Sequence, residues 1–145
     1  MKRAVTFLSL SPGDQFRLLL TALLLLIAPA GISVSSFPRI RSVLIRSAAL
    51  ATPVAFGAPA PTRLVWAVSI ADHHLPGSRS CLIRSLTSET LLRLYGYTPT
   101  HRIGVDPDAD GGFIAHSWLE YEGDVLIGDL EQLSQYETLP PLDDP

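Results

Sequence analysis

The second half of the chain places one helical segment directly before several short strand-like segments, and this order constrains the fold most. Residues 82–95 are rich in leucine and end at Gly96, a residue typical of helix C-termini. Three segments follow, at residues 103–105, 113–121 and 125–127, whose hydrophobic patterns predict strands. A helix followed by hairpin-connected strands predicts an α+β fold, with the helix packed on a small antiparallel sheet.

Cys81 is the only cysteine, and it stands at the predicted start of that helix. Residues 76–80 (PGSRS) are turn and capping residues, and the positive end of a helix dipole favours a thiolate over a thiol. His116 lies in the strand-like segment 113–121, from which an imidazole could accept the thiol proton. A helix-borne cysteine and a strand-borne histidine are the nucleophile and base of papain-like and transglutaminase-like enzymes. The alternative is that Cys81 is a small buried core residue.

Four motifs around these residues occur in a characteristic order. The motifs are SCLIRSL at 80–86, LLRLYG at 91–96, IGV at 103–105 and AHSWLE at 115–120, followed by Gly123. Together they resemble the lasso peptide biosynthesis B2 proteins. These are transglutaminase-like leader peptidases related to the C-terminal domain of the microcin J25-processing protein. The resemblance covers about residues 10–139 of the 145.

The resemblance implies a cysteine peptidase in which Cys81 is the nucleophile and His116 the general base. The third member of such a triad is an aspartate on the strand after the hairpin turn, and Asp129 is the best match. The family pattern places this aspartate one residue earlier, where this chain has Gly128. A bulge or strand end at Gly128 would turn the Asp129 side chain back toward His116, because glycine accepts unusual backbone angles. Asp124, in the turn, is the alternative.

The resemblance also implies a set of partners. These are a lasso precursor peptide with its leader and core, a separate leader-recognition B1 protein, and an ATP-dependent lasso cyclase. The peptidase chemistry requires no metal and no organic cofactor. Two alternatives stay open: acyl transfer on the same fold, and a membrane-associated accessory protein or pseudo-enzyme without catalysis.

Composition places further limits on the chain. A length of 145 residues predicts one domain, and a single cysteine excludes an internal disulfide and fits a reducing cytoplasm. Residues 1–70 carry a net charge of +6, whereas residues 71–145 carry −9. The basic residues are scattered and aromatic residues do not alternate with them, so the pattern is not typical of nucleic-acid binding.

The N-terminal half contains an uncharged run at residues 18–38, which is long enough to span a bilayer. A helix cap at 11–14 (SPGD) instead favours a helix over 15–27, ended by Pro29 and Gly31. A second helix follows, on which Arg39, Arg41 and Arg46 form a polar stripe. We expect both helices to pack on the rest of the chain or on a partner. A membrane span, a signal peptide and peripheral membrane association are the alternatives.

The expected organisation is an N-terminal helical region at 1–50, a Pro-rich linker at 51–62, a catalytic region at 63–139 and a tail at 140–145. A third helix is expected at 63–74, and the chain beyond Tyr136 is expected to be solvated.

Two further patterns are predicted not to bind metal. Residues 106–111 (DPDADG) imitate the start of an EF-hand loop, but position twelve is Ser117 instead of glutamate. His73, His74 and His101 lack the spacing of zinc ligands and are expected to be exposed at helix ends and in loops. Trp118 either shields His116 or is simple core.

Overall fold

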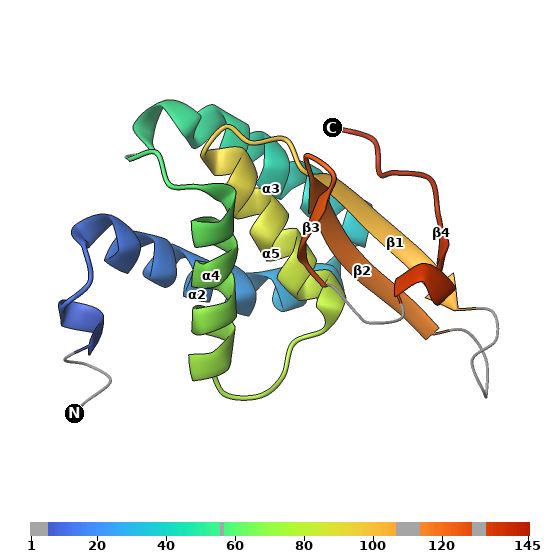
Figure 1. Ribbon diagram of the computed structural model, residues 1–145, viewed down its shortest axis with the longest axis horizontal. Helices are drawn as coiled ribbons and strands as arrows, with labels where there is room; N and C mark the ends of the chain where they lie inside the picture. The colour runs from blue at the N-terminus through green and yellow to red at the C-terminus, as the bar shows by residue number, and fades with distance from the viewer. Residues whose placement is uncertain (1–5, 56, 107–113, 129–132) are drawn as a thin grey trace.

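The computed structural model describes residues 6–55, 57–106, 114–128 and 133–145, and it has an α+β fold, as the sequence predicts. Figure 1 shows the helices on one side and the sheet on the other. The helices are α2 (Pro12–Val34), α3 (Phe37–Ala51), α4 (Pro61–His74) and α5 (Cys81–Leu94), with 3-10 turns at Thr52–Val54 and Leu133–Gln135. The strands are β1 (Thr100–Asp106), β2 (Ile114–Tyr121), β3 (Asp124–Ile127) and β4 (Glu137–Thr138). They form one antiparallel sheet in the order β3-β2-β1-β4.

Helix α5 is the central element of the fold. It packs against α2, α3 and α4 on one side and against β1, β2 and β3 on the other (Figure 1). Its residues 83 and 85–92 are all buried. The core around it consists mainly of leucine, with Leu25, Leu64, Leu86, Leu91, Leu92 and Leu119 fully buried. Burial on every side explains why α5 carries no solvent-facing polar stripe.

Helix α2 begins where its cap predicts but extends further than expected. The Asp14 N–H donates to Ser11 Oγ over 3.2 Å, which satisfies one of the free amides of the first turn. The predicted end near residue 27 is wrong, because the helix continues through Pro29 to Val34. Proline removes one backbone hydrogen bond, whereas Leu25 and Ala28 are anchored in the core. Tertiary packing therefore outweighs the local signal.

Within the part of the chain that the structure describes, α2 is the one helix long and apolar enough to cross a membrane. A core helix of a soluble protein meets the same criterion of length and composition. In this fold α2 packs on α4 and α5, yet only a third of its most apolar stretch is buried. The expected packing is therefore present, but it covers one face of α2 and leaves another exposed.

The expectation that the three arginines of α3 form one exposed stripe is wrong for one of them. Arg39 and Arg46 are exposed, as a polar stripe requires, but Arg41 is buried. The reason is a carboxylate partner on α5, Glu89, which lies 48 residues away in sequence. Sequence spacing on α3 alone could not indicate this partner.

Strands β2 and β3 form the predicted hairpin. Tyr121 pairs with Asp124, and Glu122 (φ 50°) and Gly123 (φ 85°) form a two-residue turn with positive φ at both positions. This turn matches the twist of antiparallel strands, which is why a glycine is favoured there. The loop between β1 and β2, which includes most of the EF-hand-like motif, lies outside the described residues.

The chain beyond Tyr136 is almost entirely exposed to solvent, as expected, but it is also attached to the sheet. Residues 137–138 form β4 at the edge of β1, and the Leu139 N–H donates to the Ile103 carbonyl over 2.9 Å. Further along, Arg93 pairs with Asp144 at 2.5 Å. Backbone pairing and this ion pair attach a segment whose composition indicates only solvation.

Candidate active site

Cys81 is the first residue of α5, as the sequence predicts. Ser80 caps the helix by accepting a hydrogen bond from the Ile83 N–H over 3.3 Å. The thiol is partly exposed at the positive end of the helix dipole. Among the described residues, its sulfur forms no hydrogen bond. The side chain is therefore accessible at the end of a buried helix, which does not support the alternative that Cys81 is core.

The loop before Cys81 is anchored to α4 by charged groups. The Arg79 guanidinium pairs with the Asp72 carboxylate and also donates to the carbonyl groups of residues 72, 75, 76 and 77. Arg84, one turn into α5, lies 3.3 Å from the other oxygen of Asp72. One carboxylate on α4 thus holds residues on both sides of Cys81, which fixes the start of α5.

His116 lies near the start of β2, opposite Gly104 of β1. Its Nε2 lies 2.5 Å from the Gly128 carbonyl oxygen. A carbonyl oxygen only accepts, so Nε2 must carry the hydrogen and donate it. The lone pair of the neutral ring is therefore on Nδ1, and Nδ1 is the atom available to accept a proton.

Two aromatic side chains enclose the His116 ring. Trp118 stacks on it with ring centroids 5.9 Å apart, and Tyr136 lies at 5.6 Å. Gly104 makes this possible, because a Cβ there would lie 2.9 Å from both the Trp118 ring and Tyr136 Cβ. Trp118 is itself buried, so it both belongs to the core and shields His116.

The structure brings the elements bearing Cys81 and His116 together, but not the two side chains. Helix α5 packs on β2 and also contacts β3 (Figure 1). Ser117 and Leu119 face the helices, and successive side chains alternate along a strand, so His116 faces the other side of β2. No hydrogen bond joins Cys81 to His116 within the described residues.

The third predicted residue, Asp129, lies outside the described residues. Gly128, immediately before it, has a φ of 86° just beyond the end of β3. A Cβ at this position would lie 2.7 Å from the Ser117 carbonyl oxygen, so the position requires glycine. The alternative residue, Asp124, is exposed at the opposite end of β3. Within the described residues, the group that orients His116 is the Gly128 carbonyl.

A buried polar network next to His116 was not anticipated from the sequence. Arg41 donates to both oxygens of Glu89, at 3.0 and 2.6 Å, and His101 Nδ1 donates to the Glu89 Oε2 over 2.8 Å. His101 Nε2 then accepts from the Ser117 hydroxyl over 2.6 Å. Burial raises the pKa of Glu89, but the hydrogen bonds from His101 and Arg41 outweigh it and hold that pKa below its usual value.

The predicted exposure of His101 is therefore wrong, whereas His73 and His74 are exposed at the end of α4 as expected. His101 is 1 % exposed. The residues next to His101 in sequence suggest a loop, because the carboxylate that accepts its hydrogen bond, Glu89, lies on α5 and not nearby in the sequence. The available signal was Glu89 itself, the one acidic residue of α5, since buried charges are almost always paired.

The network connects four elements around the candidate site. Arg41 belongs to α3, Glu89 to α5, His101 to β1 and Ser117 to β2. Ser117 is 2 % exposed, so the serine–histidine–glutamate arrangement is closed to substrate. Its effect is to attach β2, next to His116, to the helix that begins with Cys81.

The C-terminal segment covers the outer side of this region. Tyr136 contacts the His116 ring, and β4 pairs with β1 next to it. Arg41, which binds Glu89, also donates to the Asp143 carbonyl over 2.7 Å. The segment is thus attached to the same arginine as the buried network.

Within the described residues, no three or more His, Cys, Asp or Glu side chains lie together in one group.

One known protein family matches most of the chain. The model of the Transglutaminase-like superfamily matches residues 24–140, a stretch that includes Cys81, His116 and the whole sheet. The comparisons with curated proteins and with solved structures found no match.

Proposed function

Because the chain belongs to the Transglutaminase-like superfamily, we propose that it is a cysteine peptidase that removes the leader peptide from a lasso precursor. The superfamily shares a cysteine peptidase or acyltransferase type of fold, and its members are typically enzymes. The lasso-specific activity is the finer proposal, and it rests on the resemblance of the motifs around Cys81 and His116 to those of the B2 proteins.

The observation that carries the proposal is the accessibility of the Cys81 thiol together with the fixed orientation of the His116 ring. The Cys81 thiol is accessible at the first turn of α5, and the His116 ring is oriented through Nε2 by the Gly128 carbonyl. This orientation leaves Nδ1 as the proton acceptor. Catalytic contacts are often long in the free enzyme and shorten when substrate binds. Because His116 faces away from α5 in the free chain, we propose that substrate binding turns the imidazole toward Cys81 and that the Sγ–Nδ1 hydrogen bond forms only in that complex.

The chemistry then follows from these atoms. The thiol proton passes to His116 Nδ1 as Cys81 Sγ bonds to the carbonyl carbon of the last leader residue. The backbone N–H of Cys81, at the helix start, can donate to the oxyanion. The C–N bond breaks as His116 returns the proton to the amine of the core peptide, which leaves a thioester. Water attacks the thioester, His116 takes its proton, and the proton returns to sulfur as the S–C bond breaks.

The proposed partners follow from the same resemblance. A separate B1 protein would bind the leader, and a lasso cyclase would take the freed core. A cytoplasmic location fits the free thiol, because the cytoplasm keeps thiols reduced.

The experiment is cleavage of a lasso precursor by the purified chain together with a B1 protein, followed by mass spectrometry. We expect the wild-type chain to release leader and core, and the Cys81→Ala variant to be inactive while keeping its fold by circular dichroism. A folded Cys81→Ala variant with unchanged cleavage would overturn the proposal.

The same experiment separates the alternatives. Added hydroxylamine intercepts a thioester, so a hydroxamate on the leader in place of the free acid demonstrates the acyl-enzyme. Stable transfer of the leader to an amine in plain buffer would indicate acyl transfer in place of hydrolysis. A native Cys81 that does not react with iodoacetamide would indicate a non-catalytic accessory protein.

A further inference from the structure

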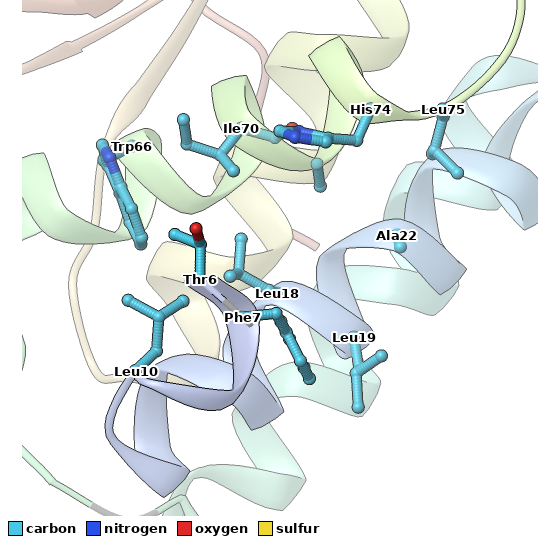
Figure 2. Close-up of a pocket in the computed structure, with 11 residues that line it drawn as sticks. Thr6, Phe7, Leu10, Leu18, Leu19, Ala22, Trp66, Ile70, His74 and Leu75 are labelled. Carbon is cyan, nitrogen blue, oxygen red and sulfur yellow. The ribbon is translucent and has the colours of Figure 1, made fainter. Parts of the chain in front are cut away.

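An apolar groove lies between α2 and α4, formed by different residues from those of the candidate active site. Figure 2 shows Trp66, Ile70 and His74 of α4 on one side and Phe7, Leu10 and Leu18 on the other. Its volume is about 490 Å³, within the range of small-molecule sites. Among the described residues, none that lines the groove is a carboxylate, lysine or arginine. Such a lining fits an aliphatic chain and offers little to a sugar, nucleotide or amino acid.

The groove continues into an exposed apolar face of α2. Leu19 lines the groove and is still 63 % exposed, and the next residues outward at helical spacing are also apolar and exposed. We call this face the α2 stripe; it consists of Phe16, Leu19, Leu23, Leu26, Ile27 and Val34. A helix that is apolar on both its buried and its outward face is typical of a membrane environment.

The rim of the groove carries surplus positive charge. Arg63 lies over the Trp66 ring at 3.7 Å, and its side chain is 41 % exposed. Its partner, Asp14, is shared with Arg17, so two guanidinium groups face one carboxylate. Hydrogen bonds from Arg63 and Arg17 hold the pKa of Asp14 at about 2, which keeps it ionised. The trio therefore has a net charge of +1.

We infer that this face binds the surface of an anionic bilayer, with one lipid acyl chain in the α2–α4 groove and the α2 stripe among the neighbouring chains. Trp66 and Arg63 lie where an aromatic ring and a cation favour the boundary between acyl chains and headgroups. Helix α2 does not span the bilayer in this arrangement, because α4 and α5 cover its other face. The inference is independent of the proposed peptidase activity.

Flotation with vesicles tests the inference directly. The full-length chain should float with vesicles of phosphatidylcholine mixed with phosphatidylglycerol and bind vesicles of phosphatidylcholine alone more weakly. Leu23→Asp places a charge in the α2 stripe and should lower vesicle affinity at least about tenfold. The matched control is Leu50→Asp, because Leu50 is an exposed leucine at the end of α3, outside the α2 stripe, and it should leave binding unchanged.

Two further measurements place the lipid. Lipids with brominated acyl chains should quench the tryptophan fluorescence of the wild type, and Trp66→Phe should abolish most of that quenching. Arg63→Gln should reduce the preference for phosphatidylglycerol about five-fold, the usual contribution of one cation near an anionic surface.

Four results would overturn the inference. These are no flotation of the wild type, equal loss in Leu23→Asp and Leu50→Asp, quenching unchanged in Trp66→Phe, and a soluble dimer that Leu23→Asp dissociates. Binding of a free fatty acid without any vesicle binding would likewise exclude the bilayer as the source of the chain. Iodoacetamide labelling of Cys81 in Leu23→Asp should match the wild type, so failure here and failure of the peptidase proposal are distinguishable.

Discussion

Removing Arg41 should destabilise the protein far more than removing an exposed arginine. Glu89 is fully buried, and Arg41 supplies two of its three side-chain hydrogen bonds, at 3.0 and 2.6 Å. Arg41→Met keeps much of the side-chain volume but leaves the carboxylate with the hydrogen bond from His101 and the more distant Arg93 guanidinium at 3.8 Å. Breaking a buried pair from one side typically costs about 3–5 kcal/mol, a large share of the roughly 5–15 kcal/mol of a typical domain.

The matched control is Arg102→Met. Arg102 pairs with Glu120 at 3.3 Å, and both side chains are about a third exposed. Solvent screens such a pair, so its loss should cost less than about 1 kcal/mol. Urea unfolding followed by circular dichroism, with comparable slopes for the three proteins, gives both values. Equal costs for the two variants would refute the account of the buried network.

The pH dependence provides a second test of the same pair. In the wild type the pKa of Glu89 lies below its usual value of 4.5. The contribution of the ionised Glu89 carboxylate to folding stability is therefore present above pH 4.5 and is lost as the pH falls below 4.5. In Arg41→Met, burial without the arginine raises the Glu89 pKa, and the folded state then takes up a proton more readily than the unfolded state. The difference in stability between variant and wild type should therefore shrink as the pH falls from about 7 to about 5. A difference that grows over this range would contradict this argument.

The remaining predictions concern the group that orients His116. Gly128→Ala should destabilise the protein by at least about 1 kcal/mol in urea unfolding, because φ is 86° and the new Cβ would meet the Ser117 carbonyl oxygen at 2.7 Å. The same variant should also slow leader cleavage in the mass-spectrometric assay, since the carbonyl it displaces holds the ring. Asp129→Ala should slow cleavage strongly if a carboxylate assists that carbonyl, whereas Asp124→Ala, at the far end of β3, should change the rate little. A strong effect of Asp124→Ala and none of Asp129→Ala would reverse this assignment.

Local sequence patterns were sufficient to predict the parts of the fold that depend on residues close together in the chain. Ser80 caps α5, so Cys81 is its first residue, and the Glu122–Gly123 turn sets the β2–β3 hairpin. Each of these depends on backbone geometry within a few residues. The same kind of signal located the strand that bears His116.

Long-range packing accounts for the predictions that were wrong. Pro29 does not end α2, because Leu25 and Ala28 are buried in the core before it and Ile32 packs against the core after it. Arg41 and His101 are buried because Glu89, on another element, compensates both. Each feature depends on a partner far away in sequence, and no periodicity within one segment can reveal such a partner.

The orientation of His116 likewise depends on a backbone group, the Gly128 carbonyl, which no residue type in the sequence indicates. A backbone carbonyl has no residue identity, so the sequence can single out an aspartate for this role but not one particular carbonyl. The position of Gly128 indicated unusual backbone angles, which the structure shows, but not that its carbonyl would face the imidazole.

The most direct test of the central claim is the rate at which a leader peptide ending in a chloromethyl ketone, which occupies the substrate site, alkylates Cys81 at neutral pH, compared between the wild type and His116→Gln. Because the chain has one cysteine, the rate reports on this thiol alone. If His116 accepts the thiol proton, the wild-type rate should exceed that of a folded His116→Gln variant at least about tenfold. Equal rates in two equally stable proteins would contradict the claim that Cys81 and His116 act as a pair.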